Sequence, residues 1–296
     1  MKQIKFGLLL AALCFFFLES CQKEYSIDNG NTPVSPSGND SFYLDRITEV
    51  YYIPGDSTIQ DFLYDNQKRI KSISKKSYQN NTLIDTSVIT LFYNGNDSLP
   101  FKLTDYLAVV GVFTWFDSTI NFLFYDAQGR MILDSSIHSS QGTGSPYHKD
   151  KDIYSVKYVA NNIYGYNTST NLSNPNPPSI QVDTTWLDAN KNILKRHFYD
   201  SQPLALFRTE DNTSFDNKLS PYFYMKQIPY FYVTSPYYTG MNNLLITHTE
   251  KLYIPAIYDV KYVHTYNAYN MPILSIGIDI PTQAVEEKIY YKYRSL

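Results

Sequence analysis

Apolar and polar residues alternate with a period of two over many short stretches of the chain, and few stretches show a helical period. The clearest examples are RITEVYYI, TSVITLFY, DIYSVKYV, LLITHTEKLYI and EEKIYYKY, which are rich in β-branched and aromatic residues and are bounded by Asn, Asp, Gly, Pro or Ser. This pattern predicts an all-β chain of antiparallel strands. Three prolines interrupt the residues near 220–240, where we expect a short helix or an irregular insert.

The stretch NFLFYDAQGRMIL, residues 121–133, predicts a tight turn between two of these strands. Asp126 suits the first position of a type I turn because its carboxylate can accept a backbone hydrogen bond, and Gly129 suits the left-handed fourth position. Similar turns are expected in FLYDNQKRI, WLDANKNIL and TYNAYNMPIL, where they begin at Asp65, Asp188 and Asn267, with Asn270 at the fourth position of the last.

The turns recur along the chain, which indicates a repeated hairpin. The residues before them are Tyr64, Tyr125, Leu187 and Tyr266, and comparable elements at Tyr93 and Phe215 shorten the repeat to about thirty residues. We therefore predict an antiparallel meander of hairpins that forms a curved sheet or an open, barrel-like wrap. Because a lone hairpin is marginal in water, each is expected to bury its apolar face against its neighbours or across a curved sheet.

The amino-terminal segment is typical of an export signal. Lys2 and Lys5 precede an apolar run from Phe6 to Leu18, which is shorter than the roughly 20 residues that a membrane-spanning helix needs. Residues 18–21, LESC, resemble a bacterial lipobox, which implies cleavage before Cys21 and acylation of its thiol; Glu19 departs from that pattern. The alternative is an ordinary secretory signal with an accidental cysteine.

Three regions follow from this interpretation. Residues 1–20 form the lipoprotein signal peptide, residues 21–41 hold the lipidated cysteine and a flexible tether rich in Asn, Ser, Pro and Gly, and residues 42–296 form a single all-β repeat domain. The other cysteine, Cys14, lies inside the signal, so the mature chain has one thiol and no internal disulfide.

The turn pattern, together with SFDNKLSPY and YNAYNMPILSI, resembles the YD-like repeats of uncharacterised lipoprotein families from Bacteroidota. That resemblance implies a cell-envelope lipoprotein of the outer membrane, with either leaflet open. In that lineage, O-linked glycans are attached to triplets in which Asp comes first, Ser or Thr second, and a small apolar residue or Thr third. Four such triplets make Ser57, Ser98, Ser118 and Thr184 candidate acceptors.

Charge and motif content narrow the function further. Removal of Lys2, Lys5 and Glu19 leaves 25 − 2 = 23 basic and 28 − 1 = 27 acidic residues, and no basic patch stands out, so nucleic acid is not an expected partner. The sequence contains no nucleophile elbow, phosphate loop or dinucleotide fingerprint. We predict no catalytic residues, no metal and no cofactor. His148 with Asp150 and Asp152 suggests at most a weak cation site, and a solvated loop is the simpler interpretation.

The chain has 29 Tyr and 17 Phe, an aromatic excess with two interpretations. The tyrosines could form a platform on which sugar rings stack, or they could pack across strands on a half-wet sheet face. We therefore expect a non-catalytic structural or binding module, attached to the membrane by its lipid, whose partner is a glycan or an envelope protein. The alternatives are a hydrolase that acts on polysaccharide and an accessory lipoprotein of an outer-membrane transporter.

Overall fold

A computed structural model describes residues 42–109, 115–144, 146–174, 177–201, 204–222, 242–252 and 256–295. These residues form sixteen strands: β1 (Phe42–Tyr51), β2 (Ser57–Tyr64), β3 (Ile70–Gln79), β4 (Thr82–Tyr93), β5 (Pro100–Val109), β6 (Trp115–Tyr125), β7 (Met131–Gly142), β8 (His148–Val159), β9 (Asn162–Asn171), β10 (Ser179–Leu187), β11 (Ile193–Ser201), β12 (Leu204–Leu219), β13 (Asn242–Lys251), β14 (Ala256–Tyr266), β15 (Pro272–Asp279) and β16 (Val285–Ser295). The described residues contain no helix. The predicted all-β class is confirmed.

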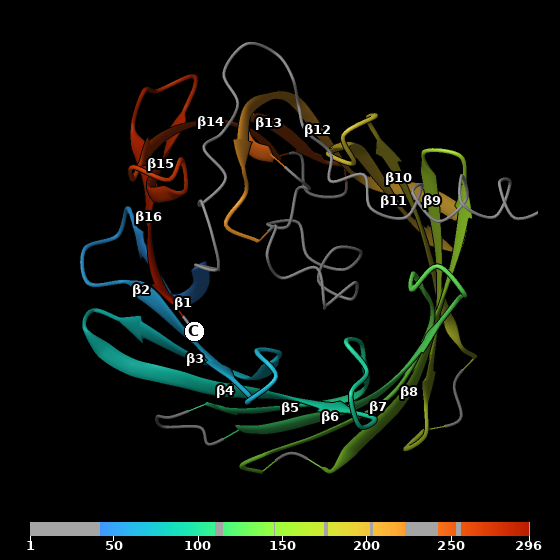
Figure 1. Ribbon diagram of the computed structural model, residues 1–296. Coiled ribbons are helices and arrows are strands. Elements are labelled where there is room, and N and C mark those ends of the chain that lie inside the picture. The colour runs from blue at the N-terminus through green and yellow to red at the C-terminus, as the bar shows by residue number, and fades with distance from the viewer. Residues whose placement is uncertain are drawn as a thin grey trace, which may run out of the picture. The chain divides into compact units, whose positions relative to one another are not determined.

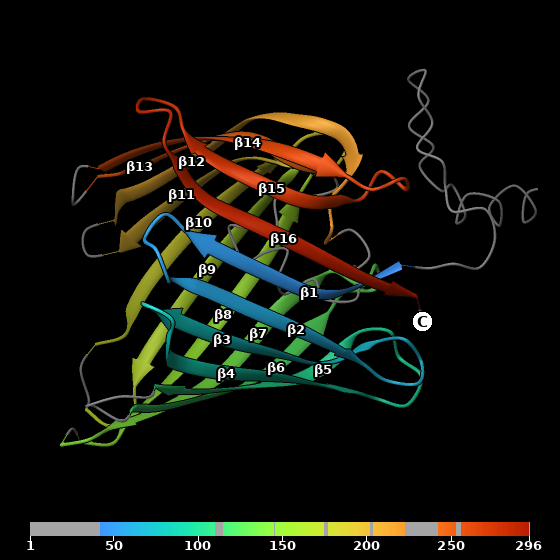
Figure 2. The same ribbon diagram turned by 90° about the vertical axis from the view of Figure 1, so that its left-hand side faces the viewer.

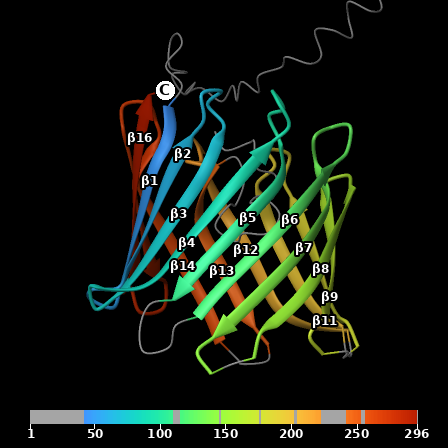
Figure 3. The ribbon, with the colours of Figure 1, turned by 90° about the horizontal axis from the view of Figure 1, so that it is seen from below.

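Each strand pairs antiparallel with the next, and β1 pairs with β16 to close the barrel. The closing register runs from Phe42 opposite Ser295 to Tyr51 opposite Glu287. Figures 1 and 2 show the ring of strands and the adjacent β1 and β16, and Figure 3 shows that the strands run obliquely to the barrel axis. The meander is therefore a closed barrel rather than an open wrap, and closure leaves no unpaired sheet edge.

The turn that follows β6 shows how the hairpins are made. The Gly129 N–H donates to the Asp126 carbonyl, and Asp126 Oδ1 accepts from the N–H groups of Gln128 and Arg130. Gly129 has φ +73°, in the left-handed region that favours glycine. Equivalent turns begin at Asp65, Asp188 and Asn267, and their fourth residues have φ between 58° and 65°: Lys68, Lys191 and Asn270.

A row of tyrosines lies at this same end of the barrel, one residue before a turn or at the end of the last strand. Their hydroxyls donate to a backbone carbonyl at the start of the preceding strand over 2.8–2.9 Å, in the pairs Tyr64–Leu44, Tyr93–Ile70, Tyr125–Pro100, Tyr158–Met131 and Tyr293–Pro272. We call these five residues the rim tyrosines. Burial raises the pKa of the rim tyrosine Tyr158 to about 12, so its hydroxyl stays a donor at neutral pH.

The turn arginines complete the repeat. The Arg69 guanidinium lies 4.2 Å from the centre of the Tyr93 ring, and the Arg130 guanidinium lies 4.5 Å from that of Tyr158. Each arginine also pairs with the aspartate that opens its own turn, at 2.7 Å. One hairpin is thus fastened to the next by a cation over an aromatic ring, which explains why Tyr, Asp and Arg recur together.

Two apolar clusters lie beneath the rim tyrosines. Leu44, Ile47, Phe62, Ile70, Ile73, Leu91 and Ile289 form one, and Leu103, Leu123, Met131, Val156 and Ile163 form the other. The thirty-residue spacing holds at Tyr93, which ends β4, but it is wrong at Phe215, which lies inside β12 where the register shifts three times. Most of the insert expected near 220–240 lies outside the described residues.

Candidate functional site

Side chains of the barrel wall alternate between the lumen and the outer surface. In β6, Asn121 and Leu123 are 3% and 4% exposed, whereas Phe122 and Phe124 are 41% and 50% exposed. Directly opposed residues share a face, so the register carries this distinction from strand to strand. The face of Asn121 and Leu123 is the lumen, since the apolar clusters converge on it.

The outer wall is apolar over β4–β6. Large side chains exposed by 38–50% lie there: Val88, Phe92, Tyr106, Phe116, Ile120, Phe122 and Phe124. The expectation that every hairpin buries its apolar face holds in part for these strands: Leu91, Leu103 and Leu123 are buried in the two clusters, but a second apolar face is exposed. Closure places that face outside, while the same strands turn Asp105, Asp117 and Asn121 to the lumen.

The outer wall is charged over β11–β14. Lys195 is opposite Asp211, Asp211 is opposite His248, and His248 is opposite Asp259, so one row crosses four adjacent strands. Lys195 Nζ lies 3.2 Å from Asp211 Oδ1, and His248 Nδ1 lies 2.6 Å from Asp259 Oδ1. We call these four residues the outer charged row. It lies within the strands, where a membrane barrel would present apolar side chains to lipid.

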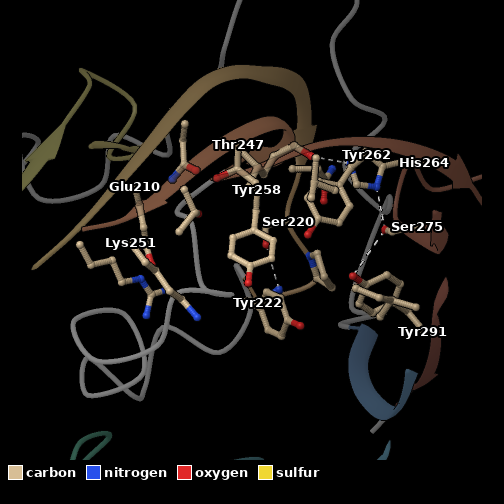
Figure 4. Close-up of a pocket in the computed structure, with 18 residues that line it drawn as sticks. Glu210, Ser220, Tyr222, Thr247, Lys251, Tyr258, Tyr262, His264, Ser275 and Tyr291 are labelled. Atoms are coloured by element: carbon tan, nitrogen blue, oxygen red, sulfur yellow. Dashed lines mark hydrogen bonds and ion pairs between the residues drawn. The ribbon is translucent and has the colours of Figure 1, made fainter. Parts of the chain in front are cut away.

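A cavity of about 470 Å³ lies on the luminal face of β12–β16. Glu210, Thr247, Tyr258, Tyr262, Ser275 and Tyr291 are among the strand residues that line it, and Ser220 and Tyr222 contribute from the segment after β12. Figure 4 shows Lys251 and Glu210 on one side of Tyr258, with Tyr262, His264 and Ser275 on the other. Four tyrosine rings, with hydroxyl and amide groups between them, give the cavity the mixed lining of a small-molecule site.

One end of the cavity is basic. Arg208 on β12 lies directly opposite Lys251 on β13. Arg208 Nη2 donates to Glu210 Oε1, and Arg196 Nη1 on β11 lies 4.0 Å from Glu210 Oε2. Arg196 and Glu210 are 3% and 5% exposed, so this ion pair is shielded from solvent. Lys251 Nζ lies 5.4 Å from the centre of the Tyr258 ring.

The other end is built from hydrogen-bonded aromatic and hydroxyl groups. His264 Nδ1 lies 2.7 Å from Ser275 Oγ, and its Nε2 lies 2.8 Å from the Leu244 carbonyl oxygen. The Tyr262 hydroxyl donates to Glu287 Oε1 over 2.9 Å. Burial raises the pKa of Glu287 even though the Tyr262 hydrogen bond acts to lower it. These contacts hold the rings of this end in place.

A second luminal group, on β6–β8, is acidic. His138 Nε2 lies 2.5 Å from Asp117 Oδ1, and His148 Nε2 lies 2.7 Å from Asp150 Oδ2. Burial alone would lower the pKa of His138, but hydrogen bonds and attraction from Asp117 and Asp150 outweigh it and raise that pKa. Burial raises the pKa of Asp134 to about 6, against the hydrogen bond donated by Asn121. Within the described residues, no three His, Cys, Asp or Glu side chains are placed to hold a metal ion.

His148, Asp150 and Asp152 lie in strand β8, so the expected solvated loop is wrong. His148 contacts Asp150, and cross-strand pairing adds His138 and Asp117 from β7 and β6. The sequence gives no signal for these partners, because they are set by cross-strand register. The same holds for Arg196, Arg208 and Glu210.

The candidate modification sites are scattered. Ser57 begins β2, Ser98 lies exposed in the turn after β4, Ser118 is half-buried within β6, and Thr184 lies mid-strand in β10 with 9% exposure. Glycosylation of these residues stays a prediction. Cys21 and the signal peptide lie outside the described residues, and no helix within the described ranges is long and apolar enough to cross a membrane.

No protein-family model and no curated protein matches the chain. Among solved structures, it is similar to a porin-like protein from Bacteroides vulgatus, with 9% identity, a TM-score of 0.54, and coverage of 86% of this chain and 100% of the other. A porin-like protein from Bacteroides uniformis aligns at 8% identity and a TM-score of 0.32, over 85% of this chain and 98% of the other. The likeness to the first is one of fold: the chain shares the architecture of a porin-like β-barrel.

Proposed function

We propose that this chain is an exported lipoprotein whose barrel binds a small saccharide in its lumen without chemical conversion. The cavity on β12–β16 carries this proposal. Its volume of about 470 Å³ lies within the range of small-molecule sites. Tyr258 and Tyr222 offer flat apolar faces, while Thr247, Thr249 and Ser275 offer hydroxyls, a combination suited to the faces and edges of sugar rings.

The outer charged row supports a barrel that stands in water at the membrane surface. A lysine on the lipid face at the middle of a membrane barrel costs about 2–4 kcal/mol, and this row places Lys195 among three further ionisable residues. Because the outer charged row interrupts the apolar outer wall, attachment would depend on acyl chains at Cys21. The resemblance to YD-repeat lipoproteins of the envelope supports the same arrangement.

A membrane-spanning channel is the second candidate, favoured by the porin-like fold and the apolar outer wall of β4–β6. Fractionation separates the two. We would compare the native chain with one whose residues 1–21 are replaced by a cleavable secretory signal without the cysteine. The native protein should need detergent for extraction, and the exchanged protein should be recovered in the aqueous fraction. An exchanged protein that still resists an alkaline carbonate wash would show that the wall itself inserts.

Ligand retention tests the lumen. Immobilised mature protein should bind members of an oligosaccharide array, and Tyr258→Ala should weaken that binding at least tenfold by removing a ring that lines the cavity. Tyr166→Ala on the outer face, where Tyr166 is 45% exposed, is the matched control. Chromatography of the bound sugars should return them at their original length. Shortened products would favour the hydrolase alternative instead.

A further inference from the structure

The basic end of the cavity holds two like charges in direct opposition. Arg208 and Lys251 face each other across β12 and β13, and both line the cavity. Directly opposed like charges destabilise a pair of strands, unlike the opposite charges of Lys195 and Asp211 on the outer wall. The repulsion between Arg208 and Lys251 therefore disfavours the pairing of β12 with β13 at this place.

The counter-charge at this end is small. Glu210 is the one carboxylate among the described cavity-lining residues, and both Arg208 and Arg196 are directed at it. No carboxylate of the described residues lies within ion-pair distance of Lys251, whose charge instead lies near the Tyr258 ring. Arg208 Nε is buried without a hydrogen-bond acceptor. Arg208 and Lys251 thus share one glutamate among the described cavity-lining residues, whereas Arg196 is also attracted to Asp183 on β10.

The segments that adjoin the basic end in the chain add no carboxylate. Residues 223–241, which follow Tyr222 in the chain, read FYMKQIPYFYVTSPYYTGM and contain no Asp or Glu. Residues 202–203 and 253–255, which flank β12 and β14, contain none either. An anion bound in the cavity would therefore complement Arg208 and Lys251 at this end.

We propose that the cavity takes an acidic saccharide, whose anionic group lies between Arg208 and Lys251 while its ring packs on Tyr258. This inference rests on the proposed saccharide binding and adds the charge of the ligand. A guanidinium can donate hydrogen bonds to the oxygens of a carboxylate or a sulfate, and Arg208 lines the cavity. Thr247, Thr249 and the Tyr262 side chain then face the ring hydroxyls.

The experiment uses the mature protein on an array of matched oligosaccharides: a neutral series, the same series with uronic acids, and the same series with sulfate esters. Acidic members should be enriched among the binders. The affinity of the best one should fall as salt rises from 50 to 300 mM, because salt screens the attraction between its anionic group and the cations of the protein. Comparison of the uronic and sulfated members identifies which anion is preferred.

Variants then locate the charge. Lys251→Gln should weaken the best acidic ligand about tenfold while leaving neutral members unchanged, because it removes one charge-assisted contact. Arg208→Gln should do the same, and its thermal midpoint is recorded because Arg208 also holds Glu210. Lys261→Gln is the matched control: Lys261 lies on β14 opposite Ile246 and Ile278, on the outer face, and should leave affinity unchanged.

The outcomes separate the two proposals. Equal binding of neutral and acidic members, or an unchanged affinity in Lys251→Gln, would overturn the acidic ligand and leave saccharide binding in place. A folded protein that retains no member of any series would overturn saccharide binding itself.

Discussion

The rim tyrosines provide a direct test of how the barrel is held together. Tyr125→Phe removes one hydroxyl that donates to the Pro100 carbonyl over 2.8 Å and leaves the ring in place. A neutral hydrogen bond contributes about 0.5–1.5 kcal/mol, and a buried carbonyl left without a donor costs about 1–3 kcal/mol. Pro100 is among the most deeply buried residues, so the upper part of the first range, about 1.5 kcal/mol, is the expected loss.

For a domain of this size, each kcal/mol lowers the melting temperature by about 2–4 °C, so Tyr125→Phe should melt roughly 3–6 °C below the parent. Differential scanning calorimetry of the mature protein measures the change. Tyr166→Phe on the outer face is the matched control, because Tyr166 is 45% exposed and its loss should shift the midpoint by less than about 1 °C. Equal midpoints for Tyr125→Phe and Tyr166→Phe would refute the role of the rim hydroxyls.

Combination of two rim substitutions extends the test. Tyr64 and Tyr158 donate to Leu44 and Met131, which are different acceptors on separate hairpins. Their effects should therefore add in a Tyr64→Phe, Tyr158→Phe double variant. A double variant no less stable than either single one would show that the hydroxyls act through something other than independent hydrogen bonds.

Three further substitutions probe the wall. Gly165→Ala should destabilise the barrel by about 1–3 kcal/mol in urea unfolding. The added Cβ would occupy the space in which the Tyr154 hydroxyl donates to Asp183, and an unchanged unfolding midpoint would contradict this packing. Asp134→Asn should stabilise the protein at pH 8 but not at pH 4. Burial raises the pKa of Asp134 in the folded protein to about 6, so its ionisation disfavours folding as pH rises from the unfolded pKa through 6. A gain in stability that does not depend on pH would contradict this. Asp65→Asn should reduce the loss of stability that the protein shows in acid. Hydrogen bonds to the Asp65 carboxylate outweigh burial and lower its pKa in the folded protein, so their stabilisation is present above the unfolded pKa and is lost as pH falls through the folded pKa. Unchanged melting curves in acid would refute this.

The turns and the strands adjoining them were determined by short stretches of sequence. An Asp or Asn whose side chain accepts hydrogen bonds from the next backbone N–H groups fixes each bend within five residues, as at Asp126 and Asn267. Alternation then fixes which side chains share a face. Both effects are local, so they could be predicted from the sequence, including the roughly thirty-residue spacing that ends at Tyr93.

Which face became the interior was decided by the closed structure. Alternation alone does not distinguish an apolar face that packs inward from one that turns outward, and on β6 the phenylalanines are outside while Asn121 is inside. His148 and Asp150 were expected in a solvated loop, but they lie in strand β8, and their contacts with His138 and Asp117 depend on strands β7 and β6. His248 and His264, which sit on adjacent strands, face opposite sides of the wall.

The cavity was decided entirely by tertiary structure. Arg208 on β12 and Tyr291 on β16 line one space, although more than 80 residues separate them. Strand count, register and the pairing of β1 with β16 set the curvature that brings them together, and each depends on the sum of all sixteen strands rather than on any one. Local hydrogen bonds determined the hairpins, whereas the shape and charge of the lumen exist only after the last strand has met the first.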